Sequence, residues 1–194
     1  MMVKDPSWAI AEHICGADFG DLPAATRDAT RNDILDTFGC ILGGSGEPGI
    51  AELTRVLGGW GGAEQSRVIM RQRRLPAPQA ALLNGSMAHA LDFDDTLDHG
   101  GSIHPGASVL AASLAVSDLL GGVSGQQFLL AVALGLDLSC RVALASTVDR
   151  GWHRTAAMGV FGAAAAAGKL LDLDVSQMVN AAKLRLCPFK GIKG

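Results

Sequence analysis

Segments whose apolar residues recur at helical spacing follow one another along almost the whole chain, separated by proline, glycine or capping residues. In the segment that Pro76 opens, Leu83, Met87 and Leu91 step by four residues, as one face of an α-helix requires. The same pattern predicts helices at 8–17, 23–44, 50–57, 76–95, 105–120, 155–171, from 124 onward and from about 175. Only residues 66–70 are typical of a strand. Eight helices and one strand predict an all-α protein, a multi-helix bundle.

The most apolar of these segments begins with Ser124 and Gln127, which have the spacing of a capping box. Its apolar run, 128–136, is too short to cross a bilayer. Asp137 and Arg141 follow at the spacing of an i,i+4 ion pair. We therefore expect a wholly buried core helix with this pair as its polar feature, and no membrane partner.

Composition excludes several classes of protein. The 194 residues suffice for one domain with a real core, and 48% hydrophobic against 18% charged residues excludes a disordered chain. The net charge of −3 does not indicate a basic surface, so no nucleic-acid partner is expected. The four cysteines are far apart, which favours buried free thiols, and the first residues lack a secretory signal. We expect a cytoplasmic protein.

Residues 89–104 are the richest in chemistry, with three of the five histidines and four aspartates. If the helix continues to residue 95, His89, Asp92 and Thr96 share one of its faces. The Gly-Gly pair at 100–101 then lets the chain turn, so that His104 comes back beside them. Imidazoles and carboxylates gathered at a helix end are suited to general acid–base catalysis near neutral pH.

Three other interpretations of this segment were weighed. Asp94, Asp95 and Asp98 match the aspartate-rich magnesium motif of isoprenoid synthases, but no second metal motif or aromatic pocket accompanies it. The pattern Asp92-x-Asp94-x-Thr96 matches haloacid dehalogenase phosphatases, but that motif must end a buried strand of an α/β fold. The third interpretation is a solvated helix end with local caps, in which Asp94 and Asp95 cap or pair locally.

Three blocks of sequence resemble the MmgE/PrpD family in the right order and at the right spacing. The first is NGSMAHALDFDDT with HPGASVLAASLAVSD; the second is SGQQFLLAVALGLDLSCRVA, which resembles the long central helix; the third is Gly151-Trp152-His153-Arg154-Thr155 followed by GVFGAAAAAGKLLDLD. The resemblance extends over about residues 7–181. It implies a helical domain at 1–181, the incomplete N-terminal part of a larger two-domain enzyme, and a divergent tail at 182–194.

The resemblance also implies a function and a site. Family members act without metal or other cofactor on small di- or tricarboxylates. They include 2-methylcitrate dehydratase of propionate metabolism, cis-aconitate decarboxylase and an iminodisuccinate epimerase. Carried over by position, the catalytic residues are Asp92, His104 and His153, and the substrate-binding residues are Thr96 and His89. His104 and His153 would transfer protons or bind carboxylates, Asp92 would orient a histidine or bind a hydroxyl, and Thr96 would donate a hydrogen bond.

The chain also departs from the family pattern. Arg154 stands where many relatives have proline, and residues 183–190 replace a small-residue helix. Relatives are more than twice as long and bring a lid domain with a further lysine and histidine to the site. We therefore expect little or no dehydratase activity from this chain. The alternative is a non-catalytic remnant or a self-associating helical module; apolar faces left uncovered favour association, and a homodimer is expected.

Overall fold

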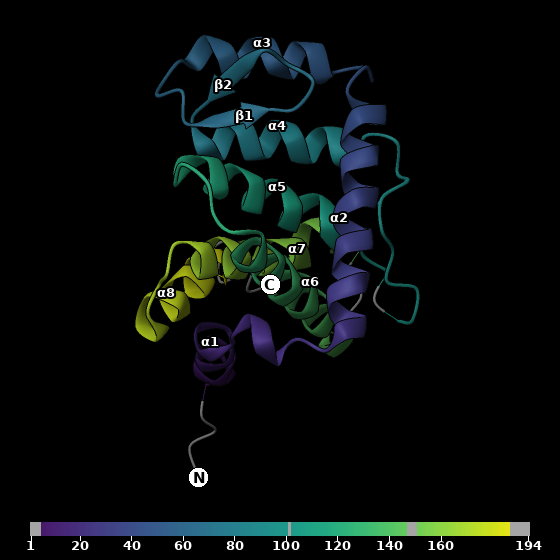
Figure 1. The fold of residues 1–194 in the computed structure, drawn as a ribbon. Coiled ribbons are helices and arrows are strands. Elements are labelled where there is room, and N and C mark those ends of the chain that lie inside the picture. The colour runs from purple at the N-terminus through teal and green to yellow at the C-terminus, as the bar shows by residue number, and fades with distance from the viewer. Residues whose placement is uncertain (1–4, 101, 147–150, 187–194) are drawn as a thin grey trace, which may run out of the picture.

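The computed structural model describes residues 5–100, 102–146 and 151–186 (Figure 1). Within them it has eight α-helices, two short strands and a single 3₁₀ turn, which confirms the predicted all-α class. The elements in chain order are α1 (Pro6–Gly16), η1 (Phe19–Asp21), α2 (Ala24–Gly44), α3 (Ile50–Trp60), β1 (Ser66–Val68), β2 (Arg73–Leu75), α4 (Ala77–His89), α5 (Pro105–Leu119), α6 (Gly125–Ala145), α7 (Arg154–Leu170) and α8 (Val175–Leu186).

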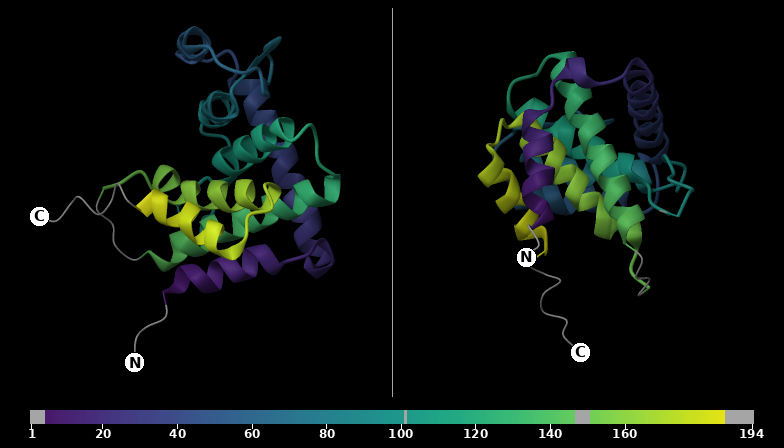
Figure 2. Two further views of the ribbon diagram at one scale, coloured as in Figure 1. Left: turned by 90° about the vertical axis from the view of Figure 1, so that its left-hand side faces the viewer. Right: turned by 90° about the horizontal axis from the view of Figure 1, so that it is seen from below.

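The helices pack in successive layers around two apolar clusters. In Figure 1, α4 lies on α5, α5 lies over α6 and α7, and α2 runs down the side of this stack and touches α4, α5 and α6. Its core includes Leu83, Leu110 and Val132, all fully buried. At the other end α1 packs beside α8, as Figure 2 shows, around a second cluster that contains Ile14 and Val179. The two clusters bury different faces of α6 and α7.

A hairpin replaces the single strand that the sequence predicts. β1 pairs with β2 in antiparallel register, and Met70 adopts a positive φ of 59° in the turn between them. β2 has the sequence Arg-Arg-Leu, which carries no strand pattern. Its position comes from tertiary contacts: Leu75 is buried, and β2 pairs with β1, which Asn84 of α4 holds by donating to Arg67 O and accepting from the backbone N–H of Ile69.

The prediction of a helix from 76 to 95 is wrong at its C-terminal end, because α4 stops at His89. Asp92 has a φ of 56°, in the left-handed region, and Leu97 pairs with Ile103 in an isolated β-bridge. Asp92 and Thr96 therefore do not share a helix face with His89. The physical reason lies in tertiary contacts: the chain turns so that Ile103 and the side chain of Asp94 are both buried.

The structure confirms the capping box and the ion pair of α6. Ser124 and Gln127 exchange hydrogen bonds, and Arg141 Nε donates to Asp137 at 2.6 Å. The expectation of a wholly buried helix is wrong, because these side chains are 73% exposed at Arg141 and 45% at Asp137. By length and composition alone, α6 is apolar enough to cross a membrane, but half of its apolar stretch is buried in the protein, as in an ordinary core helix.

Two glycines let α6 and α7 approach each other closely. A Cβ on Gly162 would collide with Ser139 Oγ and with the backbone oxygen of Gly135. We therefore expect Gly162→Ala to lower the free energy of unfolding by about 1–3 kcal/mol, because the helices must separate. Gly39→Ala is the matched control, since a Cβ there meets nothing within 4 Å; it should stabilise α2 by about 0.5–1 kcal/mol. Urea unfolding of both variants measures the difference, and equal effects would contradict the close contact.

The departure at 183–190 falls only partly within the described residues. α8 begins at Val175, as predicted, and is capped by reciprocal hydrogen bonds between Asp174 and Gln177. It continues to Leu186. The stop predicted at Pro188, and the rest of the segment, lie outside the described residues.

Candidate functional site

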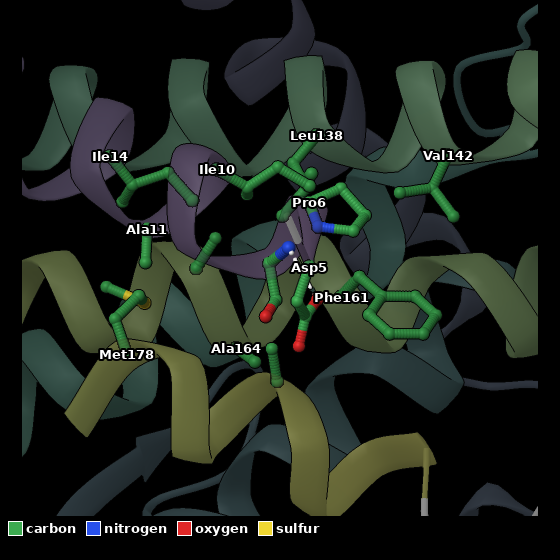
Figure 3. Close-up of a pocket in the computed structure, with 13 residues that line it drawn as sticks. Asp5, Pro6, Ile10, Ala11, Ile14, Leu138, Val142, Phe161, Ala164 and Met178 are labelled. Atoms are coloured by element: carbon green, nitrogen blue, oxygen red, sulfur yellow. Dashed lines mark hydrogen bonds between the residues drawn. The ribbon is translucent and has the colours of Figure 1, made fainter. Parts of the chain in front are cut away.

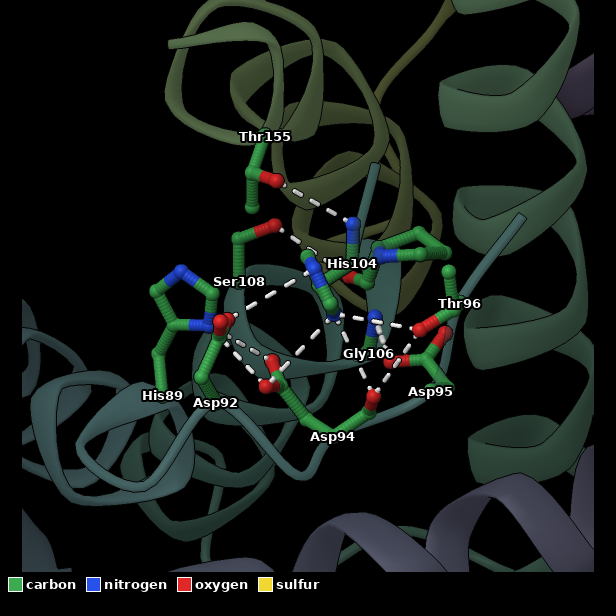
Figure 4. Close-up of polar contacts among 10 residues, drawn as sticks. His89, Asp92, Asp94, Asp95, Thr96, His104, Gly106, Ser108 and Thr155 are labelled. Atoms are coloured by element: carbon green, nitrogen blue, oxygen red, sulfur yellow. Dashed lines mark hydrogen bonds and ion pairs between the residues drawn. The ribbon is translucent and has the colours of Figure 1, made fainter. Parts of the chain in front are cut away.

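Five residues predicted for the site gather where three helix ends meet, and Figure 4 shows all of them except His153. His89 is the last residue of α4, and His104 and His153 are the N-cap residues of α5 and α7. Asp92 and Thr96 lie in the loop between α4 and α5. Because the loop, rather than a continuous helix, brings Asp92 and Thr96 to His104, the predicted convergence holds although the predicted helix does not.

The three imidazoles lie side by side. The ring centre of His89 is 5.1 Å from that of His104 and 5.6 Å from that of His153. His89 therefore neighbours both of the histidines to which the resemblance assigns proton transfer. His153 is exposed and His104 is partly buried, so a small molecule can reach both.

Asp94 is the buried carboxylate of the cluster. Its side chain has no exposed surface and contacts His89 Nδ1 at 2.9 and 3.0 Å. A buried carboxylate bonded to one ring nitrogen orients the imidazole and selects the tautomer that carries a proton at that nitrogen. From sequence, Asp94 was expected to cap or pair locally, and its contact with His89, five residues earlier, is such a local pair. The sequence did not predict that Asp94 is buried while its apolar neighbour Phe93 is 75% exposed.

His104 is held from several sides, as Figure 4 shows. Its backbone N–H donates to Thr155 Oγ1 at 3.1 Å, and its Nδ1 lies 3.2 Å from the carbonyl oxygen of Asp94 and 3.4 Å from Thr96 Oγ1. A carbonyl can only accept, so this contact favours the tautomer with the proton on Nδ1. His104 Nε2 is then free to accept a proton, with Asp92 Oδ1 3.7 Å away.

A second pair of carboxyls lies behind this cluster. Asp95 accepts a hydrogen bond from the backbone N–H of Gly106 at 2.8 Å, and Asp33 of α2 is close enough for the two carboxyl groups to influence each other's pKa. Burial raises the pKa of Asp95, although the Gly106 hydrogen bond opposes this. Burial, and next the charge of Asp95, raise the pKa of Asp33 to about 8. Sequence reasoning missed Asp33, because an aspartate in a helix rich in polar residues carries no signal.

Arg154, the departure from the family pattern, caps the end of α6. Its guanidinium donates to Ala143 O at 2.6 Å and to Ser146 O at 3.3 Å. These are carbonyls of the last turn of α6, where a cation is favourable. Since Arg154 is also the first residue of α7, the contact ties the end of α6 to the backbone that presents His153.

The cluster contains a donor set that a divalent metal can use. His89, Asp92, Asp94 and His104 each offer one nitrogen or oxygen atom, and these atoms lie within 4.8 Å of one another. Two imidazoles and two carboxylates suit zinc or a similar ion. The hydrogen bond between His89 and Asp94 already satisfies two of these atoms, so the cluster does not require an ion. The metal-independent, cofactor-free site expected from sequence stays a prediction.

Cations for binding carboxylates are missing from the contacts of this cluster. Throughout the described part of the chain, no lysine or arginine takes part in a hydrogen bond or ion pair with the five predicted side chains or with Asp94. The side chain of Asp92 is 77% exposed. Among the described residues, the contacts of the cluster thus include acid–base groups but no lysine or arginine that could hold an anionic substrate.

An apolar cavity lies away from these residues, between α1, α6, α7 and α8 (Figure 3). Its volume is about 170 Å³, and Ile10, Ile14, Leu138, Phe161 and Met178 are among its lining residues. It contains no histidine and only one carboxylate, Asp5, so it does not offer the acid–base groups of the cluster.

Comparison with known proteins supports the family resemblance. The family described as MmgE/PrpD N-terminal domain matches residues 8–191. Mouse cis-aconitate decarboxylase is 30% identical over 185 residues, which is 91% of this chain and 38% of the mouse protein. The human enzyme is 30% identical over 90% of this chain and 37% of its own length. The cis-aconitate decarboxylase-like protein oryM of Aspergillus oryzae is 31% identical over 79% of this chain and 34% of its own length. The chain thus spans little more than a third of these relatives.

Proposed function

This chain belongs to the MmgE/PrpD family, and from that premise we propose that its cluster of histidines and aspartates is the proton-transfer part of a lyase site for small di- or tricarboxylates. The observation that carries the proposal is that His104 and His153 both neighbour His89, to which buried Asp94 is bonded. Two reachable imidazoles beside an oriented third provide a base and an acid within one small volume.

The proposed roles follow from the contacts. His104 accepts a proton at Nε2, because its Nδ1 faces the carbonyl oxygen of Asp94. In a dehydration, the imidazole of His104 takes the proton from the carbon next to a carboxylate. The imidazole of His153, as imidazolium, protonates the departing hydroxyl to give water. In a decarboxylation, a carbon–carbon bond breaks, carbon dioxide leaves, and the electron pair left on carbon takes a proton from an imidazolium. Asp92 orients His104 or binds a substrate hydroxyl, and Thr96 donates a hydrogen bond.

Two substrates compete. The sequence resemblance put 2-methylcitrate first, which would place the protein in propionate metabolism. The names of the relatives favour cis-aconitate, because three of them are described as cis-aconitate decarboxylases or as similar to one. Both acids carry three carboxylates. Dehydration removes a proton from a carbon and decarboxylation adds one to a carbon, so the same imidazoles could serve either reaction.

We expect at most trace turnover of either acid by the 194-residue chain. The physical reason is that, within the described part of the chain, the contacts of the cluster bring no lysine or arginine to the substrate carboxylates. Asp92 is also open to water, which weakens each electrostatic contact. Proton NMR of each acid, incubated with the purified chain, measures its consumption and the product formed. Turnover well above that of the boiled chain would contradict the expected low activity.

Ligand binding tests the proposed function itself. Millimolar cis-aconitate should shift the imidazole NMR signals of His104 and His153, while His13 on α1 serves as an internal reference. The uncharged trimethyl ester is the matched control and should shift neither. If the free acid moves His13 as much as His104, or moves no histidine at all, the cluster is not a carboxylate site. The alternative, a self-associating module without a site, would then be supported by concentration-dependent size in sedimentation.

A further inference from the structure

Two of the predicted site histidines begin the helices that carry them. His104 is the N-cap residue of α5, and His153 is the N-cap residue of α7. Neither imidazole makes the side-chain hydrogen bond by which an N-cap residue usually satisfies the first turn of its own helix. The separation of the two imidazoles therefore depends on how the starts of α5 and α7 are held together.

A threonine of α7 joins the two helix starts. Thr155 lies two residues after His153, and only 8% of its surface is exposed. Its Oγ1 accepts a hydrogen bond from the backbone N–H of His104 at 3.1 Å, as Figure 4 shows. The N–H of an N-cap residue has no acceptor within its own helix. Thr155 supplies this acceptor from a helix that begins far along the chain from His104.

Small residues allow α5 and α7 to come close enough for this bond. Gly159 lies one turn after Thr155 and faces α5, because a Cβ there would come within 2.5 Å of Ser108 Oγ. Ser108 Oγ in turn donates to the carbonyl oxygen of Pro105 at 3.2 Å. The first turns of the two helices therefore touch through small side chains, with the bond between Thr155 and His104 at the end that carries the imidazoles.

The ring of His104 is held separately from its backbone. Its Nδ1 lies 3.2 Å from the carbonyl oxygen of Asp94 and 3.4 Å from Thr96 Oγ1, both in the loop before α5. These contacts orient the ring. The hydrogen bond to Thr155 instead fixes the backbone from which the ring projects, relative to α7.

We propose that Thr155 is a positioning residue: it holds the backbone of His104 to the first turn of α7 and so sets the spacing of the His104 and His153 imidazoles. His89 neighbours both, with ring centres 5.1 Å and 5.6 Å away. Proton transfer requires an acid and a base at fixed positions around the substrate, and small displacements of either are costly in rate. That this spacing serves catalysis rests on the function proposed above; the spacing itself does not.

Two variants of Thr155 test the proposal by NMR at pH 7, which requires no substrate. Thr155→Val keeps the shape of the side chain but cannot accept a hydrogen bond. The backbone amide proton of His104 should then exchange with deuterium on the order of tenfold faster, and the nuclear Overhauser effects between the His104 and His89 rings should change. Thr155→Ser keeps the hydroxyl and should keep both the slow exchange and the ring contacts of the unchanged protein.

Thr54→Val is the matched control. Thr54 is also a partly buried helical threonine, but its Oγ1 donates to Ile50 O within α3, which lies several layers away from α7 in Figure 1. Its replacement also removes a hydroxyl hydrogen bond, so it should change the melting temperature while leaving the His104 amide and the imidazole contacts as they are.

The outcomes separate positioning from general stability and from function. If Thr155→Val lowers the melting temperature but leaves the His104 amide exchange and ring contacts unchanged, Thr155 is merely structural and the proposal fails. It also fails if Thr155→Ser loses these features as fully as Thr155→Val, because the hydroxyl is then not the group that matters.

The proposal stays testable if Thr155→Val does not fold. The His104 amide of the unchanged protein then decides: exchange at the rate of an unfolded chain overturns the proposal, and slow exchange there and in Thr155→Ser supports it. If these results hold but cis-aconitate moves no histidine signal in the unchanged protein, the proposed function fails while the positioning role stands.

Discussion

Replacing Asp94 by alanine is expected to lower the free energy of unfolding by about 2–4 kcal/mol, because it leaves His89 without its buried partner and opens a space beneath it. The Asp94 side chain has no exposed surface and contacts His89 Nδ1 at 2.9 Å, with His104 Nδ1 3.7 Å away. One substitution therefore removes the carboxylate that two imidazoles face. Urea unfolding followed by circular dichroism measures the change.

Two control variants show whether the change in stability comes from the contact of Asp94. Asp98→Ala removes an exposed aspartate of the same loop and should change stability by no more than about 0.5 kcal/mol. Asp94→Asn keeps an acceptor for the Nδ1 proton of His89 and should cost less than Asp94→Ala. If Asp94→Ala behaves like Asp98→Ala, then the contact between Asp94 and His89 is not a structural feature of the protein.

The helical class was predictable because each helix carries its own signals. Pro105 at the start of α5, Ser124 with Gln127 before α6, and the start of α8 at Val175 are local features, and the structure confirms all of them. The errors lie where tertiary contacts override local pattern. α4 stops at His89, because burial of Asp94 and Ile103 requires a loop. β2 forms because Leu75 packs into the hydrophobic core.

The members of the site could be predicted better than its geometry. Family resemblance identified His89, Asp92, Thr96, His104 and His153, and the structure brings these five together, while their chemical roles remain predictions. Asp94 and Asp33 could not be assigned in this way. The importance of Asp94 comes from its burial, and that of Asp33 from its burial and from Asp95, which is distant in the chain. Single-sequence patterns contain neither.

The stability of the protein should fall as the pH rises from about 4 to about 8, and Asp33 should cause much of this fall. Its pKa is raised from the ordinary 3.8 to about 8 in the folded protein, first by burial and next by the charge of Asp95. In this window the unfolded chain releases the proton while the folded protein keeps it. The folded state binds more protons, so stability decreases with pH and levels off above pH 8.

Asp33→Asn should remove this dependence. One retained proton is worth up to about 1.4 kcal/mol per pH unit, and on the order of 4 kcal/mol over the window once partial exposure is allowed for. Urea unfolding at pH 5, 6, 7, 8 and 9 measures the free energy of unfolding of both proteins. The value for the variant, relative to that for the unchanged protein, should increase up to pH 8 and stay constant above it. Asp28→Asn, an exposed change on the same helix, should leave the slope as it was. Parallel curves for Asp33→Asn and the unchanged protein would mean that Asp33 is already ionised at neutral pH and that burial does not raise its pKa as expected.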